Sequence, residues 1–140
     1  MPRTTTSFRL DDSLRPRRAT MAQREGLSVN GLIERFIREG LANGEHEGIQ
    51  LKAGPAGRRA ALAGGPDVWE VVDALRGTPG SEAERISATA ELLGLHERQV
   101  FIALDYAAAD RAEIESWIEA NERALDEAER VAAERRRLIA

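Results

Sequence analysis

This chain of 140 residues has no cysteine, a single lysine, six aromatic residues and no long apolar run. The absence of cysteine fits a reducing compartment. No segment approaches the roughly 18 consecutive apolar residues of a membrane-spanning helix, so we expect no membrane span. Met1-Pro2-Arg3 leads directly into a polar, alternating segment, which is not the pattern of a signal peptide. We therefore expect a cytoplasmic protein.

The residue patterns of common catalytic and cofactor-binding sites are also missing. His46 and His96 stand alone, with no second ligand at metal-binding spacing. The run Gly54-Pro55-Ala56-Gly57 lacks the Lys-Ser/Thr pair of a phosphate-binding loop. No nucleophile is matched with a base. We expect a binding protein without a metal or other cofactor, not an enzyme.

Charge is divided unevenly along the chain. Residues 1–44 carry 8 arginines against 5 carboxylates, a net charge of +3. Residues 45–140 carry 12 lysine and arginine residues against 19 carboxylates, a net charge of −7. The basic part can approach phosphate, whereas the acidic part would repel DNA and suits a protein partner. Arginine outnumbers lysine by 19 to 1, which is typical of bacterial genomes rich in G and C.

The most informative segment is residues 4–10, which alternate between two faces with period 2. The pattern predicts a strand with Thr5, Ser7 and Arg9 on one face. A lone strand would leave its backbone groups and its apolar face in water, so we expect a second copy of the chain to pair with it in a homodimer. Such a two-stranded ribbon fits the major groove of DNA.

Two helices should follow the strand. Asp11-Asp12-Ser13 predicts the start of the first helix and Gly26 its end. Ser28 predicts the start of the second helix, which should end at Asn43-Gly44. Its apolar stripe is broad enough to need a partner. The stripe consists of Val29, Leu32, Ile33, Phe36, Ile37 and Leu41.

Residues 4–42 resemble the ribbon-helix-helix (MetJ/Arc/CopG) family of DNA-binding proteins. The resemblance rests on the alternating strand, the Gly26-to-Asn30 turn and the apolar second helix. It implies that outward strand residues contact bases of double-stranded operator DNA, and that the start of the second helix holds a backbone phosphate. Arg9 is the best candidate for a guanine contact. The candidate DNA-binding residues are Thr5, Ser7, Arg9, Ser28, Val29 and Asn30.

Beyond a hinge at residues 43–48, the sequence predicts a small helical module. Short runs on either side of Gly54-Pro55-Ala56-Gly57 predict a β-hairpin. Helices are predicted over 68–76, 81–93 and 96–109, the last two forming a helix-turn-helix-like pair. The segment from 110 to 140 has no glycine or proline and predicts one long helix. The predicted fold is therefore mainly α, with a ribbon-helix-helix domain (1–44), a helical module (45–109) and a C-terminal helix (110–140).

Residues 49–119 are similar to a small helix-turn-helix-like family whose members are commonly antitoxins paired with PIN-like nuclease toxins. The similarity rests on the Gly54-to-Arg59 turn, on Val68-Trp69, on Leu95, on Tyr106 and on Trp117-Ile118. Together the two resemblances imply a type II antitoxin, which represses its own operon as a dimer and neutralises a cognate toxin. No catalytic residue is implied.

The candidate toxin-binding residues each have a structural alternative. Arg58 and Arg59 could pair with metal-binding carboxylates of a toxin, or form a solvated strand. Trp69 and Trp117 could be interface residues, or core anchors. Ile118 and Leu125 lie on the long helix, whose second half has too thin an apolar stripe to bury itself and should bind a partner.

Two other classes of function remain open at this stage. A stand-alone dimeric ribbon-helix-helix repressor, of transcription or plasmid copy number, would tolerate deletion of residues 110–140. An antitoxin would lose neutralisation on that deletion and keep DNA binding. A third class is a pure adaptor that binds protein only, and it is tested at Arg9, since an Arg9→Ala change that leaves DNA affinity intact would mean that the ribbon does not read DNA.

Overall fold

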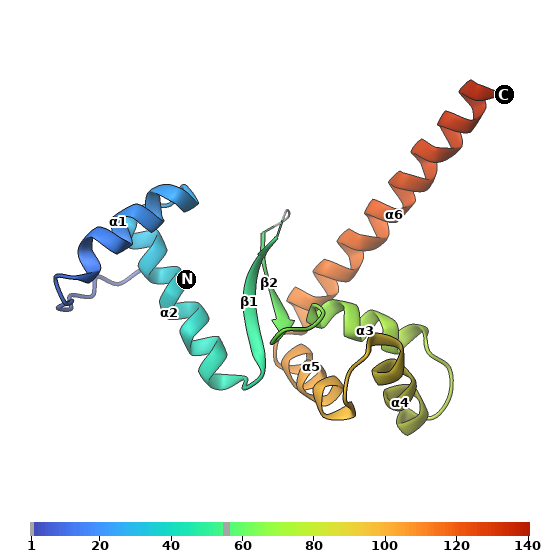
Figure 1. Ribbon diagram of the computed structural model, residues 1–140, viewed down its shortest axis with the longest axis horizontal. Coiled ribbons are helices and arrows are strands. Elements are labelled where there is room, and N and C mark those ends of the chain that lie inside the picture. The colour runs from blue at the N-terminus through green and yellow to red at the C-terminus, as the bar shows by residue number, and fades with distance from the viewer. Residues whose placement is uncertain (1, 55–56) are drawn as a thin grey trace. The chain divides into compact units, whose positions relative to one another are not determined.

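The computed structural model describes residues 2–54 and 57–140 (Figure 1). The fold is mainly helical, as predicted, with one two-stranded antiparallel sheet in the described part of the chain. The chain divides into two compact units, residues 1–42 and 43–140. The elements in chain order are α1 (Leu14–Glu25), α2 (Val29–Glu45), β1 (Ile49–Gly54), β2 (Gly57–Leu62), α3 (Val68–Gly77), α4 (Glu82–Leu93), α5 (Glu97–Ala109) and α6 (Arg111–Ile139).

The first unit contains α1 and most of α2, joined by a tight turn. Asp11 fixes the start of α1, because its Oδ1 accepts the Ser13 N–H at 2.8 Å. Hydrogen bonds from the Ser13 side chain and backbone lower the pKa of Asp11. Gly26 ends the helix with φ 66°, and the Leu27 N–H closes the turn on the Ala22 carbonyl at 2.9 Å. The predicted boundaries of this helix are confirmed.

The predicted strand over residues 4–10 is absent from the single chain, where residues 2–10 form neither helix nor strand. A strand is defined by hydrogen bonds to a neighbour. Residues 2–10 make no such ladder in the described part of the chain, where the one sheet consists of β1 and β2. The ribbon-helix-helix assignment therefore stays a prediction.

The prediction for the end of α2 was wrong by a few residues. The helix continues through Asn43 and Gly44 to Glu45. A glycine in the last turn of a helix costs only about 1 kcal/mol relative to alanine, which does not by itself end the helix.

The second unit begins with the predicted hairpin. Strands β1 and β2 pair from Ile49 opposite Leu62 to Gly54 opposite Gly57, with Lys52 opposite Arg59. The predicted turn residues Pro55 and Ala56 lie outside the described residues. The hairpin supplies apolar side chains to the core from both strands.

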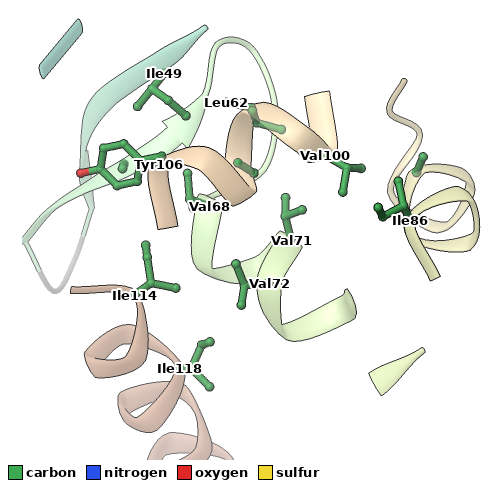
Figure 2. Packing of buried hydrophobic residues seen from close by; sticks show 13 residues of the cluster. Ile49, Leu62, Val68, Val71, Val72, Ile86, Val100, Tyr106, Ile114 and Ile118 are labelled. Carbon is green, nitrogen blue, oxygen red and sulfur yellow. The ribbon is translucent and has the colours of Figure 1, made fainter. Parts of the chain in front are cut away.

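Helix α3 lies at the centre of the core of the second unit. Figure 2 shows its side chains between those of the hairpin and those of α6. Three of its residues are buried because apolar residues follow one another almost without interruption along it. The main core residues are Ile49, Leu62, Val68, Val71, Val72, Ile86, Val100, Ala103, Tyr106, Ile114 and Ile118.

Helices α4 and α5 form the predicted helix-turn-helix-like pair. At the start of α4 the Glu84 N–H donates to Ser81 Oγ at 3.3 Å, and the Ser81 N–H donates to Glu84 Oε2 at 2.8 Å. This reciprocal pair is the predicted capping box. Gly94, with φ 66°, makes the turn into α5. None of the described helices is both long and apolar enough to cross a bilayer.

Helix α6 runs without a break from Arg111 to Ile139. Ile114 and Ile118 are buried against the core, whereas almost all side chains beyond Asn121 are exposed. In Figure 1 the second half of α6 projects away from α3, α4 and α5. The long helix is therefore anchored at one end only.

Candidate functional site

An apolar groove crosses the first unit. Its volume is about 580 Å³, and its polar lining comes from two arginines. Large side chains in and beside the groove face solvent, including Phe36, which is 47% exposed, and Ile37, which is 54% exposed. The lining residues are Phe8, Leu10, Leu14, Arg17, Arg18, Met21, Ile33, Phe36 and Ile37. The groove is where the apolar members of the predicted strand meet the stripe of α2.

The predicted base-contacting residues lie in the segment that precedes α1. Thr5, Ser7 and Arg9 are exposed. Phe8 and Leu10, which alternate with them in sequence, line the apolar groove. The period-2 alternation of the sequence is therefore reflected in which side chains reach the groove.

The start of α2 offers free backbone donors. Ser28 Oγ accepts the Gly31 N–H at 3.0 Å, and the Ser28 carbonyl accepts the Leu32 N–H at 2.9 Å. In the described part of the chain, the N–H groups of Val29 and Asn30 have no acceptor. Two unpaired N–H groups at a helix N-terminus can hold one anionic oxygen cluster, such as a phosphate.

Arg59 has a structural partner within its own module. Its guanidinium pairs with the carboxylate of Asp67, which is buried at the start of α3. The same carboxylate accepts from Lys52 Nζ at 3.2 Å and from the Trp69 indole N–H at 3.2 Å. The Asp67 N–H in turn donates to Glu70 at 2.8 Å, completing the cap of α3. This network ties the hairpin to α3.

Arg58 is placed differently from its neighbour. One of its terminal nitrogens donates to the Leu51 carbonyl across the hairpin at 3.3 Å. Arg58 and Arg59, which were predicted to act as a pair, therefore have different structural partners.

The other candidate toxin-binding residues lie on α3 and α6 and differ in how deeply they are buried. Trp69 and Trp117 are each half-buried, which matches the anchoring alternative in part. Ile118 is buried in the core, so its side chain is not available to a partner. Leu125 is exposed on the free part of α6. Of this set, Leu125 is the residue most accessible to another protein.

Sequence reasoning missed a polar cluster where α5 meets α6. The Tyr106 hydroxyl donates to Glu113 Oε2 at 2.7 Å, and the rings of His46 and Tyr106 meet edge to face with centroids 5.0 Å apart. Burial raises the pKa of Glu113, and Asp110 adds to the rise, while hydrogen bonds from Tyr106 and Trp117 oppose it. Burial likewise raises the pKa of Tyr106. The one signal in the sequence is a tyrosine and a glutamate on either side of a helix break.

Within residues 2–54 and 57–140, no group of three or more His, Cys, Asp or Glu side chains is placed to hold a metal ion. Comparison with protein-family models, with curated proteins and with solved structures finds no match to this chain.

Proposed function

We propose that this chain is the antitoxin of a type II toxin–antitoxin system. Its first unit binds operator DNA as a dimer, and its second unit binds and neutralises a partner toxin. The observation that carries the proposal is the exposed apolar face of the first unit, next to a segment with strand periodicity and no strand partner.

A second copy of the chain would cover the exposed apolar face of the first unit and would also supply a strand partner for residues 4–10. Phe8, Leu10, Phe36, Ile37 and Leu41 are all exposed, and each fully buried side chain of this size contributes about 1.5–3 kcal/mol. Pairing residues 4–10 of two chains would satisfy their backbone groups and turn Phe8 and Leu10 inward. It would leave Thr5, Ser7 and Arg9 on the outer face of the ribbon.

The outer face and the start of α2 then offer complementary contacts to DNA. Arg9 would read a base edge, since its guanidinium matches the two acceptors of guanine. The free N–H groups of Val29 and Asn30 would fix the register on the backbone through a phosphate. The net charge of +3 of the first 44 residues favours this approach.

The second unit is suited to a protein. Its net charge of −7 opposes DNA binding, including by the helix-turn-helix-like pair α4–α5. The exposed half of α6 gives a partner an apolar stripe with Leu125 on it. The class of toxin, a PIN-like ribonuclease, follows from the sequence resemblance alone.

The test is a rescue assay with the neighbouring reading frame in a bacterial host. We expect that frame to arrest growth when expressed alone, and co-expression of this chain to restore growth. Absence of toxicity, or toxicity that this chain does not relieve, would contradict the antitoxin function and favour a stand-alone repressor.

Two variants separate the activities of the two units. Arg9→Ala should keep rescue and weaken operator binding, whereas Leu125→Asp should weaken rescue and keep operator binding. A variant that lost both activities would indicate a folding defect, which circular dichroism would reveal.

A further inference from the structure

Apolar side chains on the free half of α6 follow a seven-residue repeat that continues from the core. Ile118, Leu125, Ala132 and Ile139 are spaced by seven, and Asn121, Ala128 and Arg135 fall between them at the alternate three- and four-residue steps. Ala124, Val131 and Leu138 flank the same line. A strict seven-residue repeat is the pattern of a helix that packs along another helix. We call the stretch of this line from Asn121 to Ile139 the α6 seam.

Along this line of α6, the side chains change from buried to exposed between Ile118 and Leu125. Ile118 is 4% exposed because it packs in the core, whereas Leu125 is 57% exposed. Further along, Leu138 and Ile139 are 81% and 80% exposed. The same stripe that anchors the helix thus continues for almost six more turns, and nothing in the described part of the chain covers it.

Charges on the opposite face of α6 are already paired. Arg130 binds Glu127, at 2.6 Å for its closest atoms, and Arg137 binds Glu134 at 3.3 Å. These residues lie three apart on the outer face, away from the seam. Glu122 and Arg136, which border the seam, form no such ion pair in the described part of the chain. Glu122 also acts on Arg76, whose pKa its charge helps to raise, and it remains exposed to a second helix.

We propose that the α6 seam pairs with the α6 seam of a second copy of this chain, in antiparallel orientation. The orientation follows from charge. Residues 119–134 carry six carboxylates against two arginines, and Arg135-Arg136-Arg137 follow directly. A parallel pair would set two arginine triplets side by side, whereas an antiparallel pair sets each triplet beside the acidic stretch of the other helix.

The buried end of the helix sets the register. Because Ile118 is already in the core, the pairing uses positions from Asn121 onward. The antiparallel register that uses the whole seam places Asn121 opposite Ile139 of the second copy and Ala128 opposite Ala132. Val131 then meets its own counterpart near the twofold axis. Small alanine side chains at the centre allow the two helices to approach closely.

In this register two favourable charge pairs compete with a repulsion near the axis and with the Arg135 side chain, which lies opposite Leu125 of the second copy. Glu122 lies beside Arg136 of the second copy, and the pair occurs twice by symmetry. Glu129 lies beside its own counterpart near the axis, where the two carboxylates repel. Glu129→Gln should therefore strengthen the association, in a way that an unrelated surface charge would not.

The pairing uses the face of α6 that the proposed function offers to the toxin, so toxin and second copy would compete for Leu125, and the pairing is tested on the full chain without toxin. The sequence has no cysteine, so single-cysteine variants at these exposed positions report one contact each. Under mild oxidation, Val131→Cys should form a disulfide-linked dimer. Arg130→Cys, at the same level on the outer face, is the matched control for random collisions, and we expect at least tenfold less crosslinking from it.

The end of the helix distinguishes the two orientations. In the antiparallel pair, two copies of residue 139 are separated by 18 residues along the axis, about 27 Å at 1.5 Å per residue, which is too far for a disulfide. Ile139→Cys alone should not crosslink, whereas a mixture of Ile139→Cys and Asn121→Cys chains should form a mixed dimer. Self-crosslinking of Ile139→Cys would overturn the antiparallel orientation. Val131→Cys that crosslinks no faster than Arg130→Cys would overturn self-pairing and assign the seam to a different protein.

Discussion

The Tyr106 hydroxyl donates a 2.7 Å hydrogen bond to the Glu113 carboxylate, joining α5 to the first turn of α6. Together with the burial of Ile114 just beyond it, this bond fixes where α6 leaves the core. Burial raises the pKa of Glu113, so the folded chain binds a proton at this carboxylate more tightly than the unfolded chain does. Stability should therefore depend on pH through this group.

The first prediction concerns that pH dependence. For a carboxyl group whose pKa is raised on folding, the free energy of unfolding falls as the pH rises from the usual pKa of 4.5 through the raised value. Glu113→Gln keeps an acceptor for Tyr106 and removes the titration. We expect the variant to lose this fall and to be at least as stable as the parent chain at neutral pH. Urea denaturation at several pH values measures the difference, and parallel curves for the two proteins would contradict the prediction.

The second prediction separates Arg58 from Arg59. Arg59→Ala removes a partner of the buried Asp67 carboxylate and should lower the free energy of unfolding by about 2 kcal/mol. Arg58→Ala leaves Arg59 and Lys52 on the Asp67 carboxylate, so it should lower the free energy of unfolding less than Arg59→Ala does. Thermal unfolding of the two variants checks this order. Equal losses would mean that the Asp67 network does not hold the hairpin.

This order matters for any test of toxin binding at the two arginines. A loss of neutralisation by Arg59→Ala is informative only after correction for its lower stability. The same loss by Arg58→Ala would point more directly to a contact with the partner.

The third prediction concerns the apolar face of the first unit. Phe36→Asp puts a carboxylate on a surface that the dimer would bury, at a cost of about 3 kcal/mol or more. We expect operator binding to be lost, because a ribbon needs two chains. Leu92→Asp replaces an apolar residue on α4 that is more exposed than Phe36, 70% against 47%, and should leave DNA binding unchanged. Fluorescence anisotropy with labelled operator DNA compares the two variants.

The fourth prediction concerns the base contact. Arg9→Ala should weaken operator binding by about 1–3 kcal/mol and relax the preference at one base pair. Binding is measured on the operator and on a set of single-base variants at one fixed salt concentration. A loss that is equal for every DNA would indicate a phosphate contact instead, and no loss would remove Arg9 from the reading face.

Local signals predicted most of the helices correctly. Ser81 and Glu84 form the capping box that their spacing indicates, and Gly26 and Gly94 end helices in the left-handed conformation. The hairpin was predicted from two short runs around a turn. These elements depend on interactions within a few residues, which a sequence displays directly.

The errors and omissions involve partners that are distant in sequence or in another chain. Residues 4–10 have the pattern of a strand but no neighbour in the single chain. Arg59 looked like a surface charge until the hairpin and α3 brought it to Asp67. Tyr106 and Glu113 meet because two helices turn back on each other. None of these contacts has a local signature.

The single lysine gives the second unit a built-in chemical reporter. Lys52 holds its ammonium 3.2 Å from the buried Asp67 carboxylate, and its side chain remains 39% exposed. Acylation of that amine would remove the positive charge that the carboxylate needs and would weaken the junction of the hairpin with α3. The stability that is lost when an amine-specific reagent modifies Lys52 therefore measures how much this ion pair contributes to the junction. Any enzyme that tags lysines would find its one side-chain target in this protein at the same junction.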